Sequence, residues 1–152
     1  MPTARQDPAM RRSPPSFVVP FAVLALVAAV APAAAADVAV ALHGARSADG
    51  RLQVALVDAA GFAGTAAPVA ARELAPDPAG TRLAFEGVAP GRYAVMVIHD
   101  ENGNGRLDTN LVGMPVEGYG FSNNPRVMRR PTFDEAAFEL GADGAALDIA
   151  IR

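Results

Sequence analysis

Hydrophobic and polar residues alternate with a period of two along much of the chain after residue 36. The segment 37–42 reads DVAVAL and the segment 52–57 reads LQVALV, so in each the larger apolar residues fall on one face of a strand. Turn-forming residues separate such segments at intervals of about 8–12 residues, which is typical of antiparallel sandwiches. The pattern predicts an all-β fold, a seven-stranded antiparallel β-sandwich whose strands span 37–42, 52–57, 69–74, 81–85, 93–99, 137–140 and 147–151, the last two forming a closing hairpin.

The segment 93–99 (YAVMVIH) differs from the others because both of its faces are apolar. An antiparallel strand with one face in water should alternate, so a second layer is expected to cover this strand. The candidate is the long irregular stretch 100–131, which carries too many apolar residues for a disordered linker. We therefore predict an ordered loop excursion that folds back over the sheet.

The first 36 residues have the organisation of a secretory signal peptide. Three arginines and four prolines precede the apolar run 17–30, which leads into small residues up to Ala36. An uncleaved membrane anchor is the alternative, but the run is shorter than the roughly 20 apolar residues that a spanning helix needs, and it contains Pro20. We expect cleavage after Ala36, a β-sandwich domain at 37–152, a periplasmic or secreted location, and no membrane span in the mature chain.

Charge and cysteine content exclude several classes of function. Loss of 1–36 would leave 10 arginines against 15 acidic residues, a net charge of −5. A mildly acidic domain without a basic run is not typical of a nucleic-acid-binding protein. Because the sequence contains no cysteine, disulfides, thiolate metal sites and cysteine nucleophiles are excluded.

A candidate calcium loop, DENGNGRLD, follows the doubly apolar segment. Its oxygen-bearing side chains at alternate positions and its glycine at the sixth match the first nine positions of an EF-hand loop, in which a tight turn directs every second side chain toward the ion. Four side chains and one backbone carbonyl are the expected ligands of Ca²⁺: Asp100, Asn102, Asn104, Arg106 (through its carbonyl) and Asp108.

The same residues also suit a turn without metal, because Asn and Asp side chains hydrogen-bond to the nearby backbone. Position twelve of the loop is Leu111, where an EF-hand has a bidentate Glu. Any calcium affinity should therefore be weak, about 10⁻⁴–10⁻³ M, unless Glu117 or Asp58 adds a carboxylate.

A second block, EGYGFSNN, combines aromatic and amide side chains that suit a shallow sugar- or peptide-binding patch. The alternative is that the aromatic rings anchor the loop on the sheet and the amides cap turns. With the histidine that precedes the loop, the candidate ligand-binding residues are His99, Glu117, Tyr119, Phe121, Asn123 and Asn124.

A small hydrolase that uses His99 is an alternative function, because Asp100 and Ser122 lie within the same region of the sequence. Adjacent strand residues point to opposite faces, however, so Asp100 is badly placed to orient His99. The chain also contains no Gly-x-Ser-x-Gly motif. We therefore assign no catalytic residue.

Three segments, GRYAVMVIHDENGNGRLDTN, GMPVEGYGFSNN and PTFDEAAFEL, resemble the exported bacterial family catalogued as domain of unknown function 2141, over roughly 38–152. The segment 85–97 is also similar to the strand–turn–strand of transthyretin-like (prealbumin-like) and carboxypeptidase-regulatory-like sandwich modules, which implies a seven-stranded fold. The family brings no established reaction, ligand or catalytic residue. We expect an exported, non-enzymatic binding or accessory module with a protein, peptide or carbohydrate partner. A purely structural envelope protein is a further alternative.

Overall fold

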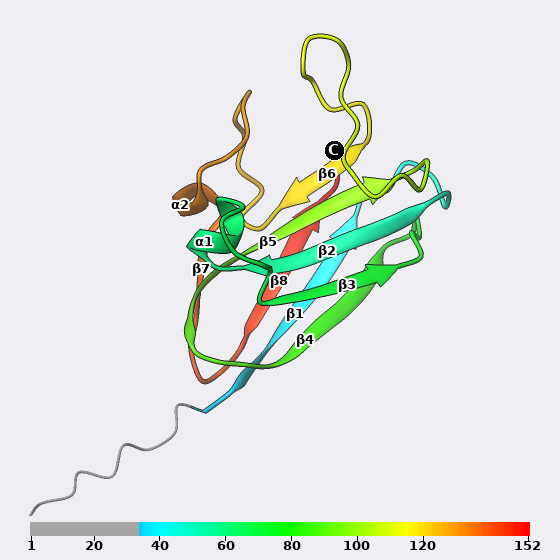
Figure 1. Ribbon diagram of the computed structural model, residues 1–152. Helices are drawn as coiled ribbons and strands as arrows, with labels where there is room; N and C mark the ends of the chain where they lie inside the picture. The colour runs from blue at the N-terminus through cyan, green and yellow to red at the C-terminus, as the bar shows by residue number, and fades with distance from the viewer. Residues whose placement is uncertain (1–33) are drawn as a thin grey trace, which may run out of the picture. The chain divides into compact units, whose positions relative to one another are not determined.

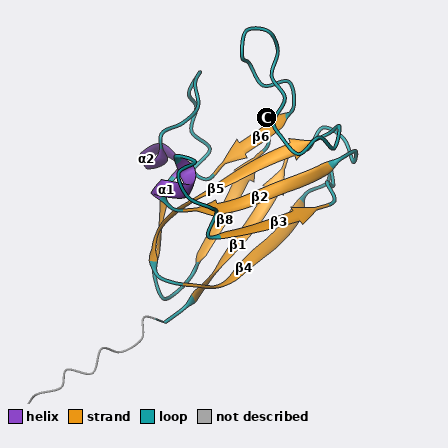
Figure 2. Ribbon diagram, in the orientation of Figure 1, coloured by secondary structure: helices purple, strands orange, loops and turns teal. Residues whose placement is uncertain are grey.

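The computed structural model describes residues 34–152, which form two β-sheets and two short helices (Figures 1 and 2). The smaller sheet has the order β4 (Thr81–Val88), β1 (Ala36–His43), β8 (Ala145–Ala150). The larger sheet has the order β3 (Ala70–Leu74), β2 (Arg51–Val57), β5 (Gly91–Asp100), β6 (Gly118–Phe121), and β7 (Phe138–Leu140) pairs with the start of β5. The helices are α1 (Ala59–Phe62) and α2 (Phe133–Ala136).

The two sheets pack face to face around one apolar core, as the period-two pattern predicts. Val38, Val40 and Leu42 of β1 are buried against residues of the larger sheet, including Val54 and Val97. The intervening side chains of β1 are exposed or partly exposed, so β1 contributes one face to the core. The prediction of an all-β sandwich is confirmed.

Three details of the predicted topology are wrong. The described residues form eight strands, because the short strand β6 was not recognised in the glycine-rich sequence GYGF. Strands β1 and β8 pair in parallel, so the fold is not wholly antiparallel. Strands β7 and β8 do not form a hairpin, since β7 pairs with β5 and β8 pairs with β1, and the turn between them crosses from one sheet to the other.

The second face of β5 is covered mainly by two short helices, and the proposed segment 100–131 contributes Phe121 to this cover. Ala94 is fully buried in a small second core with Phe62 of α1 and Ala136 of α2, and Phe121 and Phe133 pack against this cluster. Residues 109–116 instead project away from the sheet as a loop (Figure 1). The prediction that the whole of 100–131 folds over β5 is therefore wrong, because residues 109–116 leave the sheet and α1 and α2, with Phe121, supply the apolar cover.

The predicted signal peptide lies almost entirely outside the described residues. Ala36, its last residue, is the first residue of β1 and pairs with Val88. Within residues 34–152 no helix combines the length and the apolar character that a membrane crossing requires. All described strands, both helices and both apolar clusters lie within 36–152, so this part of the chain supplies its own core.

Candidate functional site

The candidate calcium loop begins where β5 ends. His99 and Asp100 close the strand opposite Leu52 and Arg51 of β2, and both are fully buried. The Nε2 atom of His99 lies 2.9 Å from the carbonyl oxygen of Asp49, whereas its Nδ1 has no hydrogen-bond partner. His99 therefore fixes the turn beside the loop and exposes no atom to solvent.

The carboxylate of Asp100 organises the first half of the loop. Its Oδ1 accepts a hydrogen bond from the backbone N–H of Asn104 (3.0 Å), and its Oδ2 accepts one from Gly105 (2.8 Å). The side chain of Gln53 on the neighbouring strand donates to the same Oδ2 at 3.3 Å. Position one of the nine-residue loop thus bonds the backbone of positions five and six, which bends the chain tightly around this carboxylate.

Three further side chains meet on the open side of this bend. The amide nitrogen of Asn102 lies 2.6 Å from Oδ2 of Asp108, and the amide nitrogen of Asn104 lies 2.9 Å from the same oxygen and 3.0 Å from Oδ1. These amide donors, more than the nearby Arg106, hold the pKa of the Asp108 carboxyl below its usual value. The structure therefore brings together the oxygen-bearing groups at positions three, five and nine of the loop.

Glu117 reaches the loop from the other end of the excursion, immediately before β6. Its Oε1 accepts hydrogen bonds from the backbone N–H groups of Glu101 (3.0 Å) and Asn102 (3.4 Å), and its Oε2 accepts one from Asp108 (2.9 Å). The side chain is only 6% exposed. Glu117 thus acts as an internal acceptor that holds the two ends of the loop together.

Asp58, the other carboxylate considered for this loop, is elsewhere. Its Oδ1 caps α1 by accepting a hydrogen bond from Gly61 at 2.7 Å. Asp58 follows Val57, and Val57 pairs with Ala94 of β5. Ala94 lies six residues before Asp100 on that strand, so Asp58 is at the opposite end of β5 from the loop. Within residues 34–152 no group of three or more His, Asp or Glu side chains is placed to hold a metal. A cation at 100–108 would depend on the two asparagine amides and a backbone carbonyl as well as on the carboxylates.

Sequence reasoning missed two side chains that support the loop. Arg46 donates from Nη2 to Oε1 of Glu101 (2.7 Å) and to the carbonyl oxygen of Val116 (2.8 Å), so it joins the loop to the following hairpin. Gln53 bonds Asp100 from the neighbouring strand. Both contacts depend on strand register and turn position, which single-sequence patterns do not fix.

The alternation of glycine and aromatic residues in β6 reflects the close approach of the last strand. Gly118 and Gly120 face inward opposite His99 and Val97. A Cβ atom on Gly120 would lie 2.9 Å from the carbonyl oxygen of Ala150, and one on Gly118 would lie 2.8 Å from a methyl carbon of Ile151. The aromatic rings of this strand are consequently on its outer side.

The SNN residues that follow β6 join three elements. The Ser122 hydroxyl donates to the carbonyl of Ala136 and accepts from the backbone N–H of Val95. The amide of Asn123 donates to the carbonyl of Ala137 at 2.7 Å. Asn123 and Asn124 have φ values of 61° and 47°, in the left-handed region that asparagine tolerates better than most residues.

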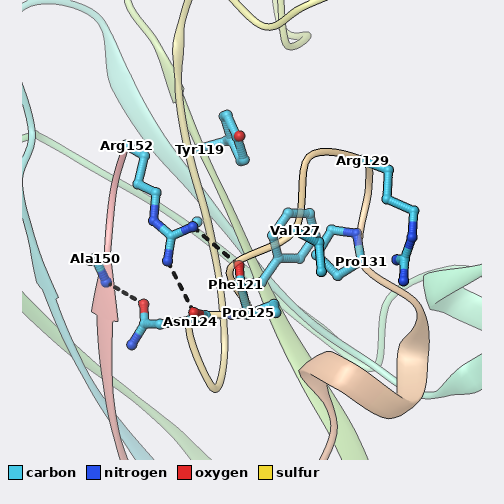
Figure 3. Close-up of a pocket in the computed structure, with 10 residues that line it drawn as sticks. Tyr119, Phe121, Asn124, Pro125, Val127, Arg129, Pro131, Ala150 and Arg152 are labelled. Carbon is cyan, nitrogen blue, oxygen red and sulfur yellow. Dashed lines mark hydrogen bonds between the residues drawn. The ribbon is translucent and has the colours of Figure 1, made fainter.

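Asn124 ties this turn to the last strand (Figure 3). Its Oδ1 accepts from the backbone N–H of Ala150, and its Nδ2 donates to the carbonyl of Asp148, both at 2.8 Å. The hollow beside it, lined by Tyr119 and Phe121 among others, has a volume of about 10 Å³, room for roughly one water molecule. The structure thus places Tyr119, Phe121, Asn123 and Asn124 in one neighbourhood, but their polar contacts hold the fold together.

The residues considered for a hydrolase do not converge. Ser122 bonds the backbone of Val95, and His99 lies four residues further along the same strand. At about 3.3 Å per residue, roughly 13 Å separates the two positions along the strand. The carboxylate of Asp100 bonds loop backbone and Gln53.

Comparison with known proteins identifies a family. The model of a family described as an uncharacterized protein conserved in bacteria (DUF2141) matches residues 40–147. No curated protein and no solved structure matches the chain significantly. Since the match spans most of the sequence and includes both the 100–108 loop and the β6 block, the chain belongs to the DUF2141 family.

Proposed function

We propose that this chain is an exported, non-enzymatic binding module of the bacterial cell envelope, and that its 100–108 loop holds a calcium ion. The observation that carries the calcium assignment is the meeting of the Asn102 and Asn104 amides with the Asp108 carboxylate at 2.6–3.0 Å. These groups lie at alternate positions of a loop whose backbone is already bent around Asp100.

The chemistry of the set suits a hard cation that prefers oxygen. Rotation of the two amides would break their N–H contacts to Asp108 and also the bonds that their oxygens accept from the backbone N–H groups of Asn104 and Arg106, and it would direct those oxygens toward an ion. Asp100, Asn102, Asn104 and Asp108 would then contribute side-chain oxygens and Arg106 its backbone carbonyl, with water completing the six to eight ligands that Ca²⁺ takes. The bound ion would supply a cross-link between the two halves of the loop.

Glu117 has a supporting role in this proposal. Both of its oxygens already accept backbone hydrogen bonds from the loop. Asp100 also accepts backbone hydrogen bonds on both oxygens, so an ion would have to share this carboxylate with the loop backbone. With Asp100 and Asp108 as the two carboxylates of the set, the expected dissociation constant is about 10⁻⁴–10⁻³ M. That range suits a protein outside the cytoplasm, which is consistent with the expected signal peptide.

A non-enzymatic role is supported by what the candidate catalytic groups contact. Ser122 is fully buried and has backbone partners on both sides, and His99 is fully buried against Asp49. Neither group is placed to reach a substrate or the other group.

Thermal unfolding of residues 37–152 in EDTA and in 10 mM Ca²⁺ tests the calcium proposal. A dissociation constant of 10⁻⁴–10⁻³ M corresponds to about 1.4–2.7 kcal/mol of added stability, or a rise of roughly 5 °C or more in Tm. Asp108→Ala should abolish the rise, whereas Asp143→Ala in the exposed turn before β8 should retain it. Equal melting temperatures of the unsubstituted domain in both solutions would contradict the proposal in favour of a metal-free turn.

A further inference from the structure

We infer that strand β4 pairs with the β4 of a second copy of this chain, so that two copies form a two-fold symmetric dimer. The inference goes beyond the binding role proposed above and does not involve the calcium ion. β4 hydrogen-bonds β1 on one side, and no strand of residues 34–152 pairs with its other side. An open edge of this kind presents unpaired backbone N–H and C=O groups that can pair with another chain.

The charges of β4 are arranged symmetrically about its centre. Arg82 and Glu86, the only charged residues of the strand, lie two positions before and two positions after Ala84. All three side chains are exposed on the outer face of the smaller sheet. In an antiparallel pair of two β4 strands centred on Ala84, Arg82 of each copy lies directly opposite Glu86 of the other copy. This register therefore forms two ion pairs at once.

Both charges are free to form these pairs. Neither Arg82 nor Glu86 has an oppositely charged partner within residues 34–152. Opposite charges placed directly across an antiparallel pair stabilise it, whereas like charges there destabilise it. The arrangement thus favours one particular partner, an antiparallel strand with the same sequence.

The same register also matches the apolar face of the strand. Leu83 and Phe85 point into the sandwich, where Phe85 is buried and Leu83 is only partly buried against the core. Pairing about Ala84 places Leu83 of one copy opposite Phe85 of the other, so each edge leucine gains an apolar neighbour. One register therefore matches the charges on the outer face and the apolar residues on the inner face.

The other sheet edges are less suited to self-pairing. On β3, Arg72 and Glu73 occupy adjacent positions on opposite faces, so a two-fold axis normal to the sheet cannot set them opposite each other. Both are also engaged within the chain: Arg72 lies over the ring of Phe85, 5.7 Å from its centroid, and Glu73 pairs with Arg51 at 2.9 Å. The edge of β8 away from β1 is bonded by the side chain of Asn124.

The paired segment is short. Residues 81–85 pair with β1 in regular register, and the register shifts beyond Phe85, where Gly87 has a φ of 67°. A bulge of this kind disrupts pairing locally, so we expect the contact to span residues 82–86 of each copy. So small a contact predicts a weak dimer, with a dissociation constant of about 10⁻⁴ M. At micromolar concentrations the domain is then a monomer.

Charge reversal tests the register. Sedimentation equilibrium of residues 37–152 in EDTA, at up to 1 mM protein, should show monomer and dimer. Arg82→Glu or Glu86→Arg alone sets like charges opposite each other and should weaken the dimer by about tenfold or more. The double variant Arg82→Glu/Glu86→Arg restores opposite charges and should return the dissociation constant to near its original value. Arg126→Glu, in the exposed loop after β6, is the control and should leave dimerisation unchanged.

A single cysteine reports the symmetry axis, since the chain contains no cysteine. Position 84 faces its own copy across the axis, where opposed Cα atoms are about 4.5–5.5 Å apart and within reach of a disulfide. Under mild oxidation Ala84→Cys should therefore form a disulfide-linked dimer. Ala39→Cys, which is exposed on β1 directly beside Ala84, lies one strand further from the axis and should cross-link much more slowly.

Other results would overturn the inference. A domain that remains monomeric at 1 mM would exclude the dimer. A dimer that both single reversals leave intact, or that cross-links no faster at position 84 than at 39, would belong to another surface, such as the exposed apolar side chains of residues 109–116. Weakening without recovery in the double variant would contradict the register. Because every sample contains EDTA, these outcomes are independent of calcium binding.

Discussion

The carboxylate of Glu117 accepts a hydrogen bond from the backbone N–H of Asp108, with the two atoms 2.9 Å apart. Its other oxygen accepts from Glu101 and Asn102, so one buried side chain spans the whole 100–108 loop. The loop is therefore closed by a residue nine positions beyond its last candidate ligand, a contact that local sequence patterns do not reveal.

Glu117→Gln should destabilise the domain by about 1–3 kcal/mol. The amide has only one acceptor oxygen, so a backbone N–H of Asp108 or of Glu101 loses its partner in a buried setting. Urea unfolding measures the change, with Glu86→Gln on an exposed position of β4 as the control. A Glu117→Gln domain as stable as the control would contradict the closing role.

Asn124→Ala should cost about 1–3 kcal/mol, because the substitution removes both 2.8 Å bonds to β8 and places alanine at a φ of 47°. Urea unfolding of the Asn124→Ala and unsubstituted proteins measures this change in the free energy of unfolding. If stability were unchanged, Asn124 would be free to serve as a ligand contact, as the sequence alone allows.

Gly120→Ala should destabilise the fold by about 1–3 kcal/mol, since the new methyl group would lie 2.9 Å from the carbonyl oxygen of Ala150. Gly141→Ala is the matched control, because nothing lies within 4 Å of its Cβ position and its φ is not positive. Similar melting temperatures for the two variants would show that β8 does not pack closely enough against β6 to require glycine at position 120.

The bidentate pair of Arg129 and Glu135 should contribute stability that depends on pH. The Arg129 guanidinium, followed by the backbone N–H of Thr132, lowers the pKa of Glu135 from 4.5 to about 2. Since the folded-state pKa is depressed, the contribution is complete above about pH 4.5 and is lost as the pH falls toward 2.

Glu135→Gln removes that contribution and provides the comparison. The nearby Asp134 pairs with Arg92 and remains in both proteins. At pH 5.5 the Glu135→Gln protein should have a lower free energy of unfolding than the unsubstituted protein. This difference between the two proteins should shrink by pH 2.5, as measured by urea unfolding at each pH. A difference that does not vary with pH would contradict the assignment.

Period-two alternation was sufficient to predict the sandwich and its inward faces, because core burial dictates which residues of β1 and β2 are apolar. It failed at β6, where the inward positions are glycine and no apolar alternation remains. It also failed to identify what covers β5, since α1 and α2 have only four residues each and leave no helical period.

The candidate loop was predicted from spacing alone, because its oxygen-bearing side chains contact groups only a few residues away: Asp100, Asn102 and Asn104 bond loop backbone, and Asp108 bonds the Asn102 and Asn104 amides. The contributions of Glu117, Gln53 and Arg46 depend on strand register and on long-range contacts. Sequence patterns therefore suggested Glu117 only as an alternative and did not suggest Gln53 or Arg46. The outward hairpin at 109–116 was misjudged for a related reason. Apolar residues in a loop predict burial only if the loop returns to the core, and here the hairpin closes on itself.

Calorimetric titration of Ca²⁺ into residues 37–152 tests the proposed ion site most directly. The account predicts one site per chain with a dissociation constant of about 10⁻⁴–10⁻³ M, absent from Asp108→Ala and retained in Asp143→Ala. Absence of binding heat at millimolar Ca²⁺, at two temperatures so that a vanishing enthalpy is not mistaken for absence, would contradict it.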